Sequence, residues 1–222
     1  MMATGDPSAH HSSRHSALPG TGPGSPPSRR WSALESLAEV DLRWHEPLAR
    51  HTTFRVGGPV RCLIRPRSQQ ALRQVIAELN RHALPRFILG GGSNLLAADQ
   101  PRDLAAIQLI RCCTEVIERG HCAGKEHFYV GAGVRLSELL RFSLVRQLAG
   151  VEHLVGIPGT VGGALVMNAG TREGCIGDVV LWVDLIEADG RVLRMERGEL
   201  AMGYRSMGLP EQALVTGAAI AL

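Results

Sequence analysis

The segment Ile88–Leu96 reads ILGGGSNLL and is the clearest candidate for ligand binding. Its three consecutive glycines lack a Cβ, so a ligand can approach the backbone closely and several N–H groups can point into one concavity. Ser93 and Asn94 add side-chain donors and acceptors at the same place. Such a concavity suits a pyrophosphate, although a glycine-rich tight turn explains the three glycines equally well. No Lys follows as in GxxxxGK[ST], which argues against the phosphate loop of an ATPase or GTPase, and the segment is not a GxGxxG followed by a long helix either.

A second glycine-rich segment, Gly156–Gly170, reads GIPGTVGGALVMNAG. Pro158 fixes one turn and Gly159 can adopt a positive φ angle. The glycine pair that follows permits close packing against a flat ligand before a short helical turn at 164–167. Asn168, after that turn, can hydrogen-bond a polar edge of such a ligand.

A third glycine cluster, Val130–Gly133 (VGAG), ends a predicted strand. Three glycine clusters spread over one α/β domain indicate a long ligand that lies across several loops. A dinucleotide has that length. A fourth feature is the sequence GYRS, in which Tyr204 offers a phenol and Arg205 a cation suited to a carboxylate. Taken alone, this tetrapeptide also fits an ordinary surface arginine.

The elements that must position these loops follow from hydrophobic periodicity. Val60–Arg65 is predicted to be a strand, and Ser68 to cap a helix with apolar residues at three- and four-residue spacing. Phe87–Leu89 is a predicted strand that leads directly into the three glycines. This succession predicts an α/β fold. Further strands are predicted at 105–110, 114–118, 127–131 and 213–222.

Two more patterns complete the predicted elements. Leu136–Leu148 is predicted to be an amphipathic helix with Leu136, Leu139, Leu140, Leu144 and Leu148 on one face. The pair Asp189-Gly190 between the strand-like runs 179–188 and 191–195 predicts a hairpin.

Composition restricts the class of protein. The 222 residues are 45% hydrophobic and 20% charged, which is typical of a globular chain. The net charge of +3, with scattered arginines and 4% aromatic residues, gives little support for nucleic-acid binding. The five cysteines form no CxxC pair, so we expect reduced thiols rather than a metal site. No apolar segment predicts a membrane span or a secretory signal.

Residues 1–30 differ from the rest in composition. Ser, Gly, Pro and Thr dominate this stretch, and Leu18 is its one large branched apolar residue. Because it can bury little apolar surface, we expect a disordered and dispensable tail.

Together these segments resemble the UDP-N-acetylenolpyruvoylglucosamine reductase family of peptidoglycan precursor synthesis. The resemblance covers roughly residues 40 to 222 and rests on four stretches in the family's order: EPLARHTTFRVGGP (Glu46–Pro59), Ile88–Leu96, Gly156–Gly170 and GYRSM (Gly203–Met207). It implies a PCMH-type FAD-binding fold, α/β or α+β, with two subdomains at 40–200. The resemblance also implies that residues 201–222 begin a separate substrate-binding domain.

The resemblance implies a set of site residues and a non-covalently bound FAD. The pyrophosphate would lie at Gly90, Gly91, Gly92, Ser93 and Asn94, and the flavin and ribityl chain at Ile157, Pro158, Gly159, Gly162, Gly163 and Asn168. Arg55, Gly57 and Gly58 would lie beside the cofactor. Arg205 matches the family's active-site arginine, with Tyr204 beside it at the substrate.

The family's chemistry consists of two hydride steps. NADPH reduces FAD, and the flavin then delivers hydride to the enolpyruvyl double bond of a UDP-linked amino sugar while a serine protonates the neighbouring carbon. This is a cytoplasmic reaction. The serine and a catalytic glutamate belong to motifs downstream of Leu222 and cannot be mapped. The apolar run at the end of the sequence favours a fragment of a longer protein over a shortened homologue.

Two other functions remain open. The chain could be a flavin-binding module without catalysis, as the unmapped serine and glutamate would suggest. It could instead be another PCMH-type oxidase, some of which attach FAD covalently through a His in the glycine loop. The segment Gly90–Asn94 contains no His, which favours non-covalent FAD and the reductase. The sequence does not indicate an oligomeric state.

Overall fold

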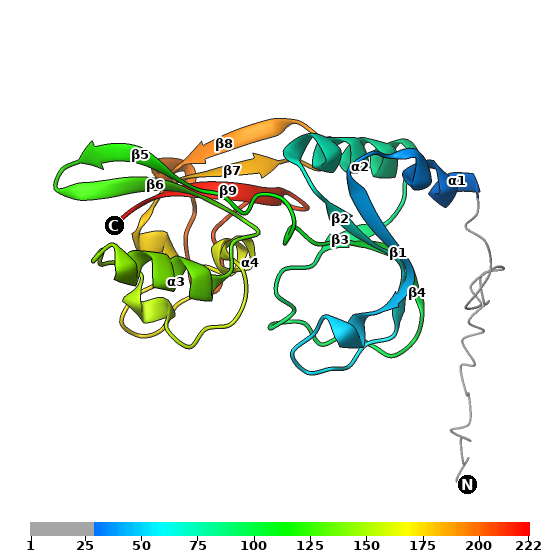
Figure 1. Ribbon diagram of the computed structural model, residues 1–222, viewed down its shortest axis with the longest axis horizontal. Coiled ribbons are helices and arrows are strands. Elements are labelled where there is room, and N and C mark those ends of the chain that lie inside the picture. Colours follow the sequence, from blue (N-terminus) through cyan, green and yellow to red (C-terminus); the bar gives the residue numbers. More distant parts are fainter. Residues whose placement is uncertain (1–28) are drawn as a thin grey trace, which may run out of the picture.

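The computed structural model describes residues 29–222, which form two lobes, each built on its own β-sheet (Figure 1). Apart from its last two residues, the predicted disordered tail lies outside the described residues. Those two begin helix α1 (Arg29–Ser32), so the tail prediction is wrong for them. Arg30 donates from Nη2 to the carbonyl oxygens of His82 and Ala83 at 2.6 and 3.0 Å. This contact anchors α1 at the end of the helix that the sequence predicts after Ser68.

The first lobe contains a four-stranded sheet in the order β1-β2-β4-β3. Strand β1 is antiparallel to β2, whereas β2, β4 and β3 are parallel. The strands are β1 (Val40–Pro47), β2 (Pro59–Pro66), β3 (Arg86–Ile88) and β4 (Arg102–Ile107). Sequence patterns predicted β2 and β3, and placed β4 three residues too late. They did not predict β1, most of whose residues are only half-buried.

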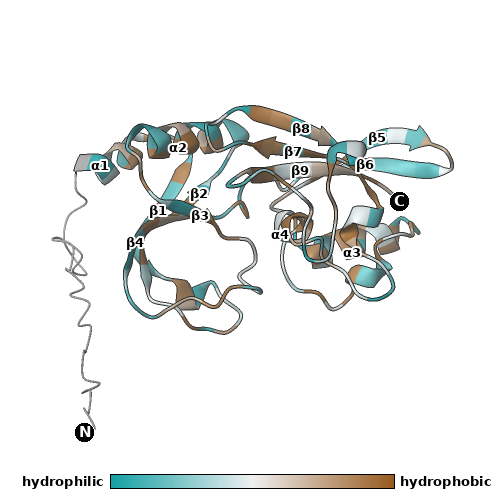
Figure 2. Ribbon diagram, turned by 180° about the vertical axis from the view of Figure 1, so that it is seen from behind, coloured by the Kyte–Doolittle hydropathy of each residue, from teal (hydrophilic) through white to brown (hydrophobic). Residues whose placement is uncertain are grey.

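Helix α2 (Gln69–Arg81) crosses over between the parallel strands β2 and β3. The Ser68 hydroxyl accepts a hydrogen bond from the amide of Ala71 at 3.1 Å and caps the helix as predicted. The predicted apolar face is buried against the sheet; its residues are Leu72, Val75, Ile76 and Leu79. Figure 2 shows this helix with hydrophobic and hydrophilic residues on different sides.

The second lobe contains a five-stranded sheet in the order β5-β6-β9-β7-β8, with every neighbouring pair antiparallel. Its strands are β5 (Val116–Cys122), β6 (Lys125–Gly131), β7 (Val180–Ile186), β8 (Val192–Glu196) and β9 (Leu214–Ala221). Helices α3 (Leu136–Val145) and α4 (Val161–Val166) lie on one side of this sheet (Figure 1). Short 3-10 turns lie between the elements of both lobes. In the first lobe they are η1 (Ala33–Ser36) and η2 (Leu48–Arg50), and in the second η3 (Glu152–Leu154), η4 (Ile176–Asp178) and η5 (Arg197–Glu199).

Strand β9 lies in the middle of the second sheet, and all eight of its residues are buried. It pairs with β6 on one side and β7 on the other. The family resemblance implied that residues 201–222 begin a separate domain. Residues 214–221 instead complete the sheet of the second lobe, because the buried backbone N–H and C=O groups of this strand find partners on both edges there.

Two local predictions require correction. Helix α3 ends at Val145, where Gln147 adopts a positive φ of 58° and the amide of Leu148 bonds the carbonyl of Ser143 at 2.9 Å. Leu144, in the last turn of this helix, is 78% exposed and not part of the buried face. The hairpin at Asp189-Gly190 is present, but its loop runs from 187 to 191 rather than over two residues.

The two lobes are tied together at that hairpin loop. Asn80 and Arg86 of the first lobe both donate to the carbonyl oxygen of Ala188, at 2.9 and 3.0 Å. Arg86 also donates to the Asn80 amide oxygen at 2.7 Å. These bonds connect the end of α2 and the start of β3 to the loop between β7 and β8.

The five cysteines are free thiols. Cys62, Cys112 and Cys113 are buried, and burial raises the pKa of Cys62 to about 12. Among the described residues, no group of His, Cys, Asp or Glu could hold a metal ion. No helix within residues 29–222 is long and apolar enough to cross a membrane.

Candidate functional site

A cavity of about 480 Å³ lies between the two lobes, beyond the carboxyl ends of β3 and β4. The first lobe contributes the segment 87–95, and the second lobe contributes the loop before α4, the end of β6 and part of β9. Ligands of parallel α/β sheets bind outside the carboxyl ends of the strands. The position of this cavity agrees with that rule.

The glycine loop Gly90–Asn94 lines the cavity and presents a row of unpaired amides. Leu89 still bonds the neighbouring strand, with its amide 2.8 Å from the carbonyl oxygen of Ile107. Within residues 29–222, none of the next five backbone N–H groups donates to a protein acceptor. Leaving a buried donor unpaired costs about 1 to 3 kcal/mol, and Gly92 is buried. Consecutive amides of this kind form an anion-binding concavity.

The two glycine loops are in backbone contact. A Cβ on Gly91 would lie 2.7 Å from the Cα of Gly159, and the Ser93 hydroxyl donates to the carbonyl oxygen of Pro158 at 3.0 Å. Gly159 has a positive φ of 135°. The structure therefore brings the predicted pyrophosphate loop and the predicted flavin loop together at one side of the cavity.

The glycine pair at the start of α4 serves two different purposes. Thr160 caps this helix, since its hydroxyl accepts from the amide of Gly163 at 3.4 Å. A Cβ on Gly162 would lie 2.8 Å from the Cβ of Ala132, so packing against the end of β6 requires glycine there. A Cβ on Gly163 would meet only the Thr160 hydroxyl, at 3.7 Å, and Gly163 lines the cavity. The missing side chain at 163 thus leaves room for a ligand.

Arg205 supplies a cation at the cavity wall. Its backbone has a positive φ of 57°, and its guanidinium lies 5.7 Å from the centre of the Tyr204 ring. Tyr204 is 92% exposed and does not line the cavity. The turn that carries both residues is closed by a 2.9 Å hydrogen bond from the amide of Gly203 to the carbonyl oxygen of Ser206.

Asn168 lies outside the cavity wall, and protein groups occupy its side-chain amide. Its Nδ2 donates to the carbonyl oxygen of Gly203 at 3.2 Å, and its Oδ1 accepts from the amide of Gly177 at 3.1 Å. Asn168 therefore connects the end of α4 to the turn that carries Arg205. This differs from the expected contact with a ligand edge.

We expect Asn168→Ala to lower the free energy of unfolding by about 1 to 2 kcal/mol, because two backbone groups lose a partner. Asn168→Asp should keep the bond from Gly177 and lose the bond to Gly203. Denaturant unfolding would measure the lower stability of Asn168→Ala. Amide exchange of residues 203–206 would detect the loss of the bond to Gly203 in Asn168→Asp. An Asn168→Ala protein with unchanged stability and unchanged exchange would show that these two bonds contribute nothing.

Three residues of the first predicted motif do not line the cavity. A Cβ on Gly58 would lie 2.0 Å from the carbonyl oxygen of Asp99, and one on Gly57 would lie 2.7 Å from the Cβ of Ala97. Both glycines therefore allow the chain to pack against the segment that follows the glycine loop. Arg55 is exposed, with a positive φ of 54°.

The remaining cavity wall is largely apolar and was not predicted. It comes mainly from residues that directly follow strands or belong to α3, α4 and β9; these include Leu109, Ile110, Leu136, Ala164, Met167, Ala213 and Val215. For these wall residues, the sequence offered one signal, the ends of predicted strands. The predicted strand 105–110 ends at Ile110, which lies just beyond β4 in the structure.

A comparison with known protein families identifies the family of this chain. A model of the FAD binding domain matches residues 60–196, which includes both glycine loops. The chain belongs to the FAD binding domain family. The amides of its glycine loop and the open space at Gly163 are consistent with a dinucleotide that carries a pyrophosphate and a flat ring.

Two curated relatives of this FAD-binding domain carry the same name. The UDP-N-acetylenolpyruvoylglucosamine reductase of Syntrophobacter fumaroxidans is 47% identical over 193 residues, which is 86% of this chain and 56% of that protein. The reductase of the same name from Desulfosudis oleivorans is 38% identical over 203 residues, 87% of this chain and 64% of that protein. The chain therefore spans 56 to 64% of the length of these two relatives.

Solved structures agree with the assignment of the fold. The crystal structure of the UDP-N-acetylenolpyruvylglucosamine reductase from Thermus caldophilus matches with a TM-score of 0.67 and 33% identity. This match covers 82% of this chain and 61% of that one. A solvent-stable cholesterol oxidase matches with a TM-score of 0.63 at 17% identity, which supports the fold alone. The FAD-binding domain has the expected PCMH-type fold, with one mixed and one antiparallel sheet.

Proposed function

We propose that this FAD-binding domain is the cofactor-binding part of a UDP-N-acetylenolpyruvoylglucosamine reductase. The observation that carries the proposal is the row of unpaired amides at the cavity, in a chain that is 47% and 38% identical to two curated reductases of that name. The overall reaction would reduce UDP-N-acetylglucosamine enolpyruvate to UDP-N-acetylmuramate with NADPH. The protein would act in the cytoplasm, as a step of peptidoglycan precursor synthesis.

The residues of the two glycine loops would hold FAD without a covalent bond. The amides of Gly90–Asn94 would donate to the pyrophosphate, since they lack protein acceptors and line the cavity. Ile157, Pro158 and Gly159 would face the flavin and ribityl part, with Gly163 leaving space for it. Arg55, Gly57 and Gly58 would support this arrangement from outside the cavity.

Arg205 would orient the substrate in such an enzyme. Bound FAD would supply the hydride for the enolpyruvyl double bond. The guanidinium at the cavity wall would pair with the substrate carboxylate and stabilise negative charge as it develops. Tyr204, stacked near this guanidinium and exposed, would contact the UDP-linked amino sugar. We assign no residue of this chain to the proton donor or the catalytic glutamate.

We expect the purified 222-residue chain to bind FAD and to release it intact after acid precipitation. Binding would be measured by the quenching of flavin fluorescence, with FMN as the matched control ligand. FMN lacks the pyrophosphate, so the amides of the glycine loop should make FAD bind much more tightly. Equal affinity for both ligands, or flavin that stays with the acid-precipitated protein, would contradict the proposed site.

A further inference from the structure

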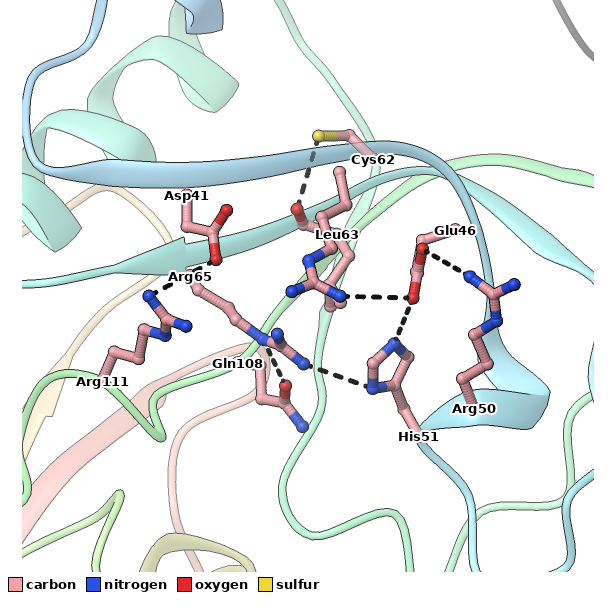
Figure 3. A network of polar contacts seen from close by, with 10 residues as sticks. Asp41, Glu46, Arg50, His51, Cys62, Leu63, Arg65, Gln108 and Arg111 are labelled. Carbon is pink, nitrogen blue, oxygen red and sulfur yellow. Dashed lines mark hydrogen bonds and ion pairs between the residues drawn. The ribbon is translucent and has the colours of Figure 1, made fainter.

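A series of largely buried polar side chains extends from Glu46 on β1 to Gln108, which directly follows β4 (Figure 3). It consists of Glu46, Arg65 and Gln108, which are 7, 7 and 5% exposed, and of His51, whose side chain is 10% exposed. Polar groups buried to this degree need partners, because an unpaired one is costly. The four side chains satisfy one another in series.

The distances between neighbouring side chains in this series are those of hydrogen bonds. His51 Nε2 lies 2.8 Å from Glu46 Oε1, and His51 Nδ1 lies 3.3 Å from Arg65 Nη2. Arg65 Nε donates to Gln108 Oε1 at 2.8 Å. Gln108 Nε2 then donates to the carbonyl oxygen of Gly90 at 3.3 Å. The series therefore ends on the first residue of the loop with unpaired amides.

Donor and acceptor chemistry fixes the direction of every bond in the series. Arginine only donates, so His51 Nδ1 must accept and His51 Nε2 must carry the hydrogen that goes to Glu46. The Gln108 oxygen is likewise occupied by Arg65, which leaves its nitrogen to face Gly90. A neutral imidazole is thus the form that fits between a carboxylate and a guanidinium.

The anchored carbonyl determines where the next amide points. The described residues contain no cis peptide bond, so the N–H of Gly91 points opposite to the carbonyl of Gly90. The same holds two residues later, where the Thr53 amide bonds the carbonyl of Gly92 at 3.0 Å. That bond directs the Ser93 N–H away from Thr53. A Cβ on Gly92 would lie 1.8 Å from the carbonyl oxygen of His51, so the His51 backbone packs against the loop as well.

We infer that His51 is a positioning residue that orients the amides of Gly90–Asn94 toward an anion through Arg65 and Gln108. Its backbone packs against Gly92, and its side chain is connected to the Gly90 carbonyl through Arg65 and Gln108. The identity of the anion as the FAD pyrophosphate rests on the proposed function. The orientation of the loop does not.

Three substitutions separate this role from general stability. His51→Leu removes the donor and the acceptor, whereas His51→Gln keeps one of each and should restore the wild-type behaviour. Gln108→Glu preserves size and still accepts from Arg65, but it has no N–H for the Gly90 carbonyl. Asp103→Asn is the matched control, because Asp103 pairs at 2.7 Å with Arg61, another buried arginine on β2.

Backbone ¹⁵N relaxation of residues 90–94 in the unliganded chain is the decisive measurement, because amides without a protein acceptor have little exchange protection to lose. We expect the order parameters of these amides to fall below about 0.6 in His51→Leu and Gln108→Glu, with little change in His51→Gln and Asp103→Asn. FAD affinity should fall at least about tenfold in the first two proteins and stay near wild type in the other two. If His51→Leu does not fold, Gln108→Glu decides alone.

Wild-type order parameters for residues 90–94 in folded Gln108→Glu or His51→Leu would overturn the inference. An equal fall in Asp103→Asn would overturn it too, since the effect would then be one of general stability. A wild-type chain that binds no FAD would refute the proposed function, while the order parameters would still decide the role of His51.

Discussion

Replacing Gly163 with leucine should abolish FAD binding in a protein that remains stably folded. A Cβ at this position meets only the Thr160 hydroxyl, so the new side chain extends into the cavity rather than into the protein. Glycine within a helix costs about 1 kcal/mol relative to alanine, so Gly163→Ala should raise the melting temperature slightly. We expect the leucine protein to bind FAD at least about 100-fold more weakly, a loss of about 3 kcal/mol in binding free energy.

Gly198 provides the control for this experiment. It is exposed, lies in η5, and an added Cβ would meet no atom within 4 Å. Gly198→Leu should bind FAD like the wild-type chain. Fluorescence titration and thermal unfolding of the three proteins would test the prediction. Normal affinity in Gly163→Leu would mean that the ligand does not occupy this part of the cavity.

A change of Arg205 to alanine should lower turnover by about 10² to 10³-fold in a full-length reductase that contains this domain, as for other preorganised donors. The cation acts mainly while negative charge builds on the substrate, so the reduction of the flavin by NADPH should change much less. Arg205→Lys should restore little activity, because an ammonium cannot form a bidentate contact with a carboxylate.

Stopped-flow traces of the two half-reactions would test this prediction separately for each step. Arg172→Ala is a suitable control, since Arg172 is exposed and does not line the cavity. Wild-type speed of the substrate half-reaction in Arg205→Ala would identify Arg205 as an ordinary surface arginine. A parallel loss in both half-reactions would instead point to damage to the FAD site.

The glycine loops could be located from the sequence, because glycine marks places where the backbone cannot carry a side chain. A glycine in the sequence does not reveal which atoms exclude the side chain at its position. At Gly58 the excluding atom is the carbonyl oxygen of Asp99, and at Gly91 it is the backbone of Gly159. At Gly163 the excluded side chain would have entered the cavity. Telling these cases apart requires contacts between segments far apart in the sequence.

The same limitation explains the elements that were misplaced or overlooked. The periodicity of α2 is local, and its cap and buried face were predicted correctly. The polar series from Glu46 to Gln108 joins β1, η2, β2 and the end of β4, and no spacing in the sequence relates these positions. Leu144 has the right type and spacing for a buried residue, but the chain leaves the helix beside it.

The central place of β9 has a consequence for how the second lobe forms. Residues 214–221 pair with residues that precede them by 86 to 94 positions in β6 and by 28 to 40 positions in β7. Before β9 is available, the sheet consists of two separate hairpins, and an isolated hairpin is marginally stable at best in water. On the ribosome, these hairpins must therefore wait with apolar edges unpaired until the eight residues of β9 emerge. Contacts of such long range also slow folding, so the first lobe should acquire its structure earlier than the second.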